Sequence, residues 1–273
     1  MKQAKYSVVD AIKRRHSVRT YQNKPLSEED LIKIKDYAAG LSNPFGAQVV
    51  VGILQKNIGG EPVKLGTYGV IKGASTFLGA SVAPGEHALE GLGYAFEDLV
   101  LYATSLGLGT VWLGGTFSRG DFRRAMNQPD GWLLPIVSPI GYPAEGRSMI
   151  EKITRKMAGS DSRKPWSDLF FDGDFLTPLT EEAAGEWREA LEMVRLAPSA
   201  TNSQPWRVVR RGGEFHFYAS CKDYSGFKPI DMGIAMQHFD ATLRSQGIEG
   251  QFVTDNPNMV LPANCAYVMT WRR

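Results

Sequence analysis

The sequence predicts an α+β protein assembled from two diverged copies of one pattern of helices and strands. Two observations carry this prediction. A Pro-led, capped helix start occurs twice, as PLSEED at 25–30 and as PLTEEA at 178–183. A long apolar helix also occurs twice, at 88–106 and at 231–248, each time with apolar strands on both sides. Two copies in one chain commonly replace the two subunits of a homodimer and pack about a pseudo-twofold axis.

The composition is that of an ordinary globular chain. Its 273 residues are 43% hydrophobic and carry a formal net charge of only +2, which gives no bulk attraction to nucleic acid or to a membrane. No stretch approaches the roughly 18 continuous apolar residues of a membrane span, and residues 1–16 lack the apolar core of a secretory signal. Its four histidines and two cysteines show no ligand spacing, so no metal site is expected. We therefore expect a cytoplasmic protein without a nucleic-acid or membrane partner.

The first half begins with two helices. Ser7 and Ser27 are expected to cap them, and the acids that follow Ser27 favour a helix N-terminus. Continuous β-branched runs predict buried strands after these helices. Apolar residues at i, i+3 and i+4 spacing then predict the first long helix, which we expect to be central and mostly buried. The expected elements are helices over 7–14, from 27, over 88–106 and over 118–127, and strands at 47–54, 75–82, 110–115 and 133–143.

The second half repeats this order after a connecting segment. Residues 145–175 are charged, contain Gly and Ser, and show little periodicity, which is typical of a connection. A helix to about residue 196 and a Pro-rich turn follow. The later elements are strands at 206–211 and 214–220, the second long helix, and a strand at 264–271. The predicted division is 1–150 for the first half, 151–177 for the connection and 178–273 for the second half.

The stretch KRRHSVRTY at 13–21 gathers basic side chains around one serine. One interpretation is a solvated basic end of the first helix, favourable to the helix dipole. The other is a phosphate clamp, in which guanidinium groups bind phosphate oxygens in pairs and the hydroxyl of Ser17 adds a hydrogen bond. Composition alone favours the first interpretation.

Four motifs occur in the order in which the flavin-dependent nitroreductase family has them. They are RRHSVR (14–19), SLGLGTVWLGG (105–115), IGYPAE (140–145) and LAPSATNSQPWRVV (196–209). Together with the duplication, they make the chain resemble the tandem, single-chain members of that family, the TM nitroreductases. The resemblance implies a nitroreductase-like fold, with two diverged copies that form a pseudo-dimer of central helices and mixed or antiparallel sheets.

The resemblance also implies one FMN per chain. Family members are homodimers in which each FMN is held by the basic motif of one subunit and the A-P-S loop of the other. Here the first half keeps RRHSVR but has LSNPFGAQ at 41–48 where the loop would stand. The second half keeps the loop but has no basic motif before PLTEEA. The two surviving components are therefore expected to meet in a single site.

Carried over residue by residue, the resemblance assigns four groups of FMN contacts. The phosphate and ribityl contacts match Arg15, His16, Ser17 and Arg19, of which Arg19 also reaches the pyrimidine edge of the ring. The strand that faces the isoalloxazine matches Leu113, Gly114 and Gly115. The contacts from the opposite subunit match Pro198, Ser199, Ala200 and Asn202. The late cations match Arg163 and Lys164, with Arg147 and Arg155 as rivals, and Thr67 stands where some relatives place a flavin-contacting Asn.

The implied activity is hydride transfer from NAD(P)H, through FMN, to a nitroaromatic, quinone or related acceptor by a ping-pong mechanism. The chemistry lies on the flavin, so no side chain is expected as a catalytic acid or base. Two alternatives stay open: a non-catalytic flavin-binding or storage protein, and a specialised relative that modifies flavin or dehalogenates reductively. The expected partner is a small-molecule acceptor, and a monomer is expected because the duplication already supplies the interface.

Overall fold

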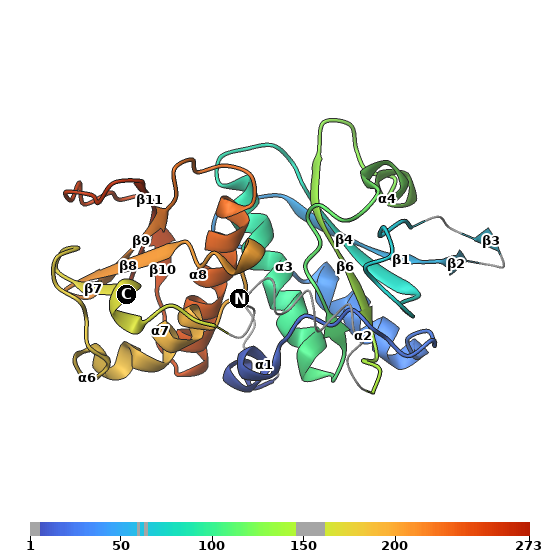
Figure 1. Cartoon of the computed structure of the whole chain (residues 1–273), viewed down its shortest axis with the longest axis horizontal. Coiled ribbons are helices and arrows are strands. Elements are labelled where there is room, and N and C mark those ends of the chain that lie inside the picture. Colours follow the sequence, from blue (N-terminus) through green and yellow to red (C-terminus); the bar gives the residue numbers. More distant parts are fainter. Residues whose placement is uncertain (1–5, 59–60, 63–64, 146–161) are drawn as a thin grey trace. The chain divides into compact units, whose positions relative to one another are not determined.

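The computed structural model describes all of the chain except 1–5, 59–60, 63–64 and 146–161 (Figure 1). The chain divides into two compact units. The N-terminal unit consists of Arg14–Ala88 and Ala95–Ala158, and the C-terminal unit of Met1–Lys13, Leu89–Tyr94 and Gly159–Arg273. This grouping gives 1–13 and 89–94 to the unit that contains the later part of the chain. The division into halves at 1–150 and 178–273 therefore stays a prediction.

The N-terminal unit contains a four-stranded antiparallel sheet. Its strands are β1 (Val49–Gln55), β4 (Thr76–Val82), β5 (Gly109–Thr110) and β6 (Leu133–Gly141), in the order β1-β4-β6-β5. Figure 1 shows β4 beside β6, and every residue of β4 is buried. β1 is an edge strand on which Val50 is 51% exposed, so the expectation of a buried strand at 47–54 is wrong for this face. A short hairpin of β2 (Asn57–Ile58) and β3 (Glu61–Pro62), which was not predicted, follows β1.

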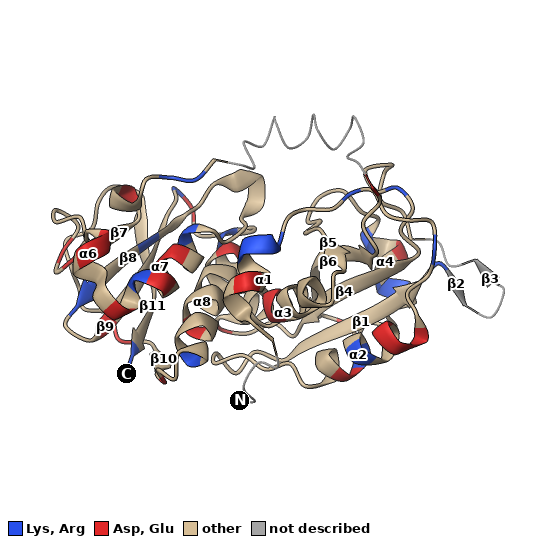
Figure 2. Cartoon of the chain, turned by 90° about the horizontal axis from the view of Figure 1, so that it is seen from below, with Lys and Arg blue, Asp and Glu red and all other residues tan. Residues whose placement is uncertain are grey.

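Helices α2 (Glu28–Ala39) and α4 (Arg119–Ala125) belong to the same unit. Ser27 caps α2 as predicted, because its Oγ accepts a hydrogen bond from the backbone N–H of Asp30 at 3.1 Å. Figure 2 shows the acidic residues that follow this cap. Phe122 of α4 meets Phe77 of β4 edge to face, with ring centroids 5.7 Å apart. Packing against α4 thus covers the buried strand of the sheet.

The C-terminal unit contains a five-stranded sheet in the order β10-β11-β9-β8-β7. Its strands are β7 (Phe170–Asp172), β8 (Trp206–Arg211), β9 (Glu214–Ser220), β10 (Gln251–Val253) and β11 (Cys265–Arg272). β7 pairs with β8 in parallel and the other pairs are antiparallel, so the sheet is mixed. β7 lies inside the predicted connection, whose last part is therefore a strand of the sheet.

The helix predicted from PLTEEA to about residue 196 is broken. It consists of α6 (Glu181–Ala184), a 3-10 turn (Gly185–Trp187) and α7 (Arg188–Arg195). The break follows from Gly185, which has φ +55 and ψ −127, outside the helical region. α7 is joined to the long helix α8 (Lys228–Ser245) by a contact of 2.9 Å between Nδ1 of His238 and the carbonyl oxygen of Met193.

The first helix, α1 (Val8–Arg14), forms where it was predicted, and the Oγ of Ser7 accepts from the backbone N–H of Asp10 at 3.3 Å. The long helix α3 (Ala88–Ser105) is also as predicted, with most of its residues buried. None of the helices in the described part of the chain is both long and apolar enough to span a membrane.

The two units share one order of strands. In the N-terminal unit β1 pairs with β4, β4 with β6, and β6 with β5. In the C-terminal unit β8 pairs with β9, β9 with β11, and β11 with β10. In both sets, counted in chain order, the first strand pairs with the second, the second with the fourth, and the fourth with the third. An 18-residue helix, α3 or α8, stands between the second and third strand of each set. Each helix also ends in the same way, because Gly107 and Gly247 follow with φ +78 and +77. Positive φ is accessible to glycine without strain, so both helices stop at the same kind of turn.

Candidate functional site

The basic segment after α1 lies along the short strand β5. Ser17 forms a bridge with Thr110, and the backbone N–H of Val18 donates to the carbonyl oxygen of Thr110 at 2.9 Å. A Cβ at Gly109 would lie only 2.8 Å from a methyl carbon of Val18, so this close approach requires glycine. Two motifs about ninety residues apart in sequence are therefore adjacent in the N-terminal unit.

Arg15 is tied to the long helix. Its side chain is only 8% exposed, and its Nε lies 3.9 Å from Oε1 of Glu97, a residue of α3 whose side chain is fully buried. The other carboxylate oxygen of Glu97 accepts a hydrogen bond from Nε1 of Trp112 at 2.9 Å. The interpretation as a solvated helix end therefore does not apply to Arg15. Arg14 and His16, in contrast, are exposed, and Nδ1 of His16 lies 3.1 Å from the carbonyl oxygen of Arg14. Trp112 packs edge to face on Phe96, with ring centroids 4.9 Å apart.

The predicted strand at 110–115 is mostly irregular. Only Gly109–Thr110 belong to β5, and Leu113 then forms an isolated bridge with Val137 of β6. Leu113 is buried, and the carbonyl oxygen of Gly114 accepts from Nη2 of Arg119 at 2.9 Å. A Cβ at Gly115 would meet nothing within 4 Å, so one side of this turn is open.

Thr67 belongs to a segment that contacts the start of α4. The carbonyl oxygen of its neighbour Gly66 accepts from the backbone N–H of Ser118, the residue before α4, at 2.9 Å. Thr67 itself is buried, and its carbonyl oxygen accepts from the N–H of Val70 at 3.1 Å. The structure thus brings the basic segment, residues 113–115 and Thr67 together in one unit.

The A-P-S loop of the C-terminal unit has an unusual backbone. Thr201, Asn202 and Gln204 all have positive φ, at 53, 56 and 47. This region is uncommon for residues other than glycine, and least favourable for a β-branched residue such as Thr201. Ser199 holds the turn closed, because its Oγ accepts from the N–H of Gln204 at 2.9 Å and its carbonyl oxygen accepts from the N–H of Asn202 at 3.0 Å. Strained backbone of this kind persists where the surroundings impose it.

The segment 162–164 holds the A-P-S loop from one side through hydrogen bonds. The side-chain oxygen of Gln204 accepts from the N–H of Lys164 at 2.8 Å, and Asn202 Nδ2 donates to the carbonyl oxygen of Ser162 at 3.1 Å. Arg163 Nη2 reaches the carbonyl oxygen of Leu196 at 3.4 Å. Burial, followed by the charge of Arg207, lowers the pKa of Lys164. The two late cations predicted from sequence thus lie beside the loop, whereas Arg147 and Arg155 lie outside the described residues.

The first turn of α8 also holds the A-P-S loop in place. Asp231, which is 2% exposed, accepts a hydrogen bond from the N–H of Ala200 through Oδ1 at 2.9 Å. Lys228 donates from Nζ to the Oγ of Ser203 at 2.7 Å. Burial raises the pKa of Asp231 to about 7, against the opposing effects of the Ala200 N–H and of Lys228. The sequence did not indicate Asp231 as a site residue.

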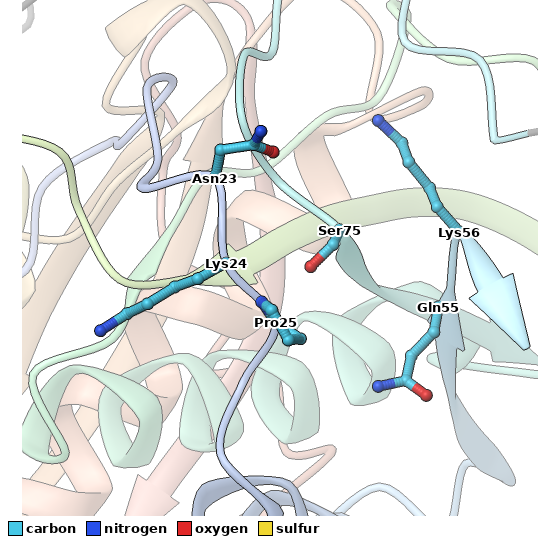
Figure 3. A pocket seen from close by; sticks show the side chains of 6 residues that line it. All are labelled: Asn23, Lys24, Pro25, Gln55, Lys56 and Ser75. Atoms are coloured by element: carbon cyan, nitrogen blue, oxygen red, sulfur yellow. The ribbon is translucent and has the colours of Figure 1, made fainter.

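A surface pocket of about 330 Å³ in the N-terminal unit contains none of the predicted site residues (Figure 3). Lys24 lies at this pocket with its ammonium 4.1 Å from the ring centroid of Tyr142, in a cation–π contact. The lining residues are Asn23, Lys24, Pro25, Gln55, Lys56 and Ser75. In the part of the chain that the structure describes, no group of His, Cys, Asp and Glu side chains is arranged to hold a metal ion.

Comparisons with known proteins agree on one family. A family model described as "Putative TM nitroreductase" matches residues 7–243. A protein of Methanothermobacter thermautotrophicus named "Putative NADH dehydrogenase/NAD(P)H nitroreductase" is 30% identical over 161 residues, which cover 53% of this chain and 81% of that protein. The crystal structure of a Thermotoga maritima protein described as a putative nitroreductase is 22% identical, with a TM-score of 0.61, and the match covers 99% of this chain and 94% of that one. The predicted nitroreductase-like α+β fold is thereby confirmed.

Proposed function

Because the chain belongs to this TM nitroreductase family and is thus an oxidoreductase, we propose that it is an FMN-dependent enzyme that transfers hydride from NAD(P)H to a nitroaromatic, quinone or related acceptor. The name of the archaeal relative, an NAD(P)H nitroreductase, supports the choice of hydride donor. When bound, FMN supplies the hydride chemistry, and the protein supplies binding, orientation and electrostatics. One site used first by NAD(P)H and then by the acceptor gives ping-pong kinetics.

The observation that carries this proposal is the pairing of Ser17 with Thr110, the last residue of β5, three residues before the turn at 113–115. A phosphate requires cations and hydroxyl or N–H donors, and Ser17, His16 and Arg19 provide them on one segment. A flat ring requires backbone without a side chain in the way, and the open side of Gly115 provides that. The donor set and the open turn therefore fit FMN.

The A-P-S loop, which belongs to the C-terminal unit, also has the chemistry of an FMN contact. Ser199, Ala200 and Asn202 are held in a fixed, strained turn, with the cations Arg163 and Lys164 beside it. A preorganised loop loses little conformational entropy when it binds a ligand. Pro198, at the start of the turn, limits the backbone further.

The shared strand order of the two sheets supports the proposed duplication. In each set of strands an 18-residue helix lies between the second and third strand. The loop before β8 is the A-P-S loop, and the corresponding loop before β1 is LSNPFGAQ at 41–48. Each copy thus keeps one component of an FMN site, so we propose one FMN per chain and a monomer that acts as a pseudo-dimer.

The test begins with the purified protein. We expect a yellow protein with one FMN per chain, whose flavin absorbance bleaches when NADH or NADPH is added in a stopped-flow instrument and returns with a nitroaromatic or quinone. Bound flavin that neither NADH nor NADPH reduces would identify a storage protein instead. A turnover that yields a cleaved flavin or a released halide would identify a specialised relative.

The binding residues are tested with Arg15→Ala combined with Ser17→Ala, which we expect to yield a colourless protein. Each charge-assisted contact contributes about 1.5–3 kcal/mol, so the double change should weaken FMN binding by orders of magnitude. Arg14→Ala is the matched control, because Arg14 is a neighbouring basic residue whose side chain is exposed. Full FMN retention in the double variant would refute the assignment of the basic motif.

A further inference from the structure

We propose that Glu97 is a positioning residue for the FMN site, which it serves by fixing Arg15 and Trp112 to the long helix α3. The proposal rests on the proposed function and adds a residue that the family motifs do not contain. Glu97 lies in the middle of α3, in the part of that helix that belongs to the N-terminal unit. It touches one residue from each of the two motifs that we assign to FMN binding in this unit.

The geometry uses both oxygens of the carboxylate. Oε2 of Glu97 accepts from the indole N–H of Trp112 at 2.9 Å, and Oε1 faces Nε of Arg15 at 3.9 Å. Trp112 directly precedes the turn at 113–115, and Arg15 is two residues before Ser17. A single side chain therefore constrains the residues that lead into the ring-facing turn and into the phosphate-binding segment.

Because Glu97 is buried, its carboxylate depends on the contacts with Arg15 and Trp112. Glu97 is fully buried, and a buried carboxylate is costly unless a cation and hydrogen-bond donors compensate it. Arg15 supplies a charge and Trp112 supplies a donor, so both side chains help to compensate the buried carboxylate. The contact with Glu97 therefore restrains Arg15 from the interior of the protein.

The second copy provides an internal comparison. Glu97 is the tenth residue of the 18-residue helix α3, and the tenth residue of the 18-residue helix α8 is Gln237, which is also fully buried. Trp112 stands five residues after Gly107, and five residues after Gly247 stands Phe252. At these two corresponding positions, the copy that lacks the basic motif therefore has neither an acid nor an indole.

The test measures FMN affinity of Glu97→Gln against Asp98→Asn. Glutamine keeps an acceptor for Trp112 but removes the charge that faces Arg15. Asp98 is the next residue of α3, and its carboxylate accepts from the hydroxyl of Tyr37 on α2 at 3.1 Å, away from both motifs. We expect the FMN dissociation constant to rise at least tenfold in Glu97→Gln and by less than twofold in Asp98→Asn.

A double-mutant cycle separates positioning from general stability. If Glu97 acts through Arg15, Glu97→Gln changes FMN affinity little when Arg15→Gln is already present. Additive losses in the double variant, or wild-type affinity in Glu97→Gln alone, would overturn the proposal. If Glu97→Gln does not fold, Trp112→Phe replaces it, and we expect the same loss of at least tenfold. A change of less than twofold in Trp112→Phe would overturn the proposal. A wild-type protein that binds no FMN would instead refute the proposed function itself.

Discussion

Asp231 offers a direct test of the way in which the A-P-S loop is held. Its carboxylate is buried under the loop, and burial raises the pKa of Asp231 to about 7, against a usual value of 3.8. At about 1.4 kcal/mol per pH unit, this difference corresponds to about 4 kcal/mol between the protonated and ionised forms. Asp231→Asn removes the charge and keeps an oxygen that can accept from the Ala200 N–H.

The sign of the effect follows from the direction of the pKa shift. Because the folded protein holds this proton more tightly than the unfolded chain, the favourable contribution is complete below about pH 4. It is lost as the pH rises through 7, where the buried carboxylate becomes charged. We therefore expect wild type and Asp231→Asn to have similar stabilities near pH 4, and the variant to be more stable above pH 7 by up to about 4 kcal/mol.

The groups that face Asp231 set the limits of this prediction. Lys228 of α8 lowers the pKa of Asp231, and the hydroxyl of Ser203 does the same. Tyr224, which interacts electrostatically with Asp231, donates to Glu90 of α3 at 2.8 Å. Burial, with Glu90 next in importance, raises the pKa of Tyr224. Since these groups are unchanged in Asp231→Asn, the difference between the two proteins isolates Asp231.

The assay is urea unfolding of both proteins between pH 4 and pH 8.5, compared as a difference in unfolding free energy at each pH. Asp223→Asn is the control, because Asp223 is an exposed acid in the segment before α8 and surface substitutions usually change stability by about 0.5 kcal/mol or less. A difference that stays constant with pH, or an Asp231→Asn protein that is less stable than wild type at pH 8, would refute the reasoning.

Two further predictions test the segments that we assign to FMN. Gly109→Ala places a methyl group 2.8 Å from the side chain of Val18, so we expect a loss of about 1–3 kcal/mol in thermal unfolding together with weaker FMN binding; unchanged values for both would contradict the close approach. Ser199→Ala removes the acceptor for the Gln204 N–H, so we expect about 1 kcal/mol lower stability and weaker FMN binding by fluorescence titration; a variant that binds FMN as wild type does would show that this hydrogen bond does not shape the loop.

Local sequence patterns predicted the long elements well. The periodic helix at 88–106 forms α3 to within one residue, and both predicted serine caps accept the expected backbone N–H groups. The misses occurred where partners decide the structure. The three-residue strand β7 is defined by its pairing with β8, and three residues are too few to show a pattern that predicts this pairing. Gly185 breaks a helix whose apolar spacing continues on both sides.

The site was predictable to the extent that it consists of contiguous motifs. The basic segment and the motif at 105–115 were expected to serve one site, and the bridge between Ser17 and Thr110 brings them together. Glu97 and Asp231 were missed because acids in the two long helices follow no spacing that marks one of them as a site residue. The role of such an acid depends on which side chains the fold brings next to it. The one indication in the sequence is an acid on a helix face that is expected to be buried.

These two acids also bear on the proposed loss of a second site. Glu97 contacts the basic segment, and its counterpart in the copy without that segment is Gln237. Asp231 contacts the A-P-S loop as the fourth residue of α8, and the fourth residue of α3, in the copy without that loop, is Gly91. In the proposed duplication, each copy therefore lacks the buried acid whose partner segment it has lost. A buried carboxylate without its partner is destabilising, so loss of a surface motif favours loss of the acid beneath it. Restoring a second FMN site would therefore require changes in the interiors of both long helices as well as in the two loops.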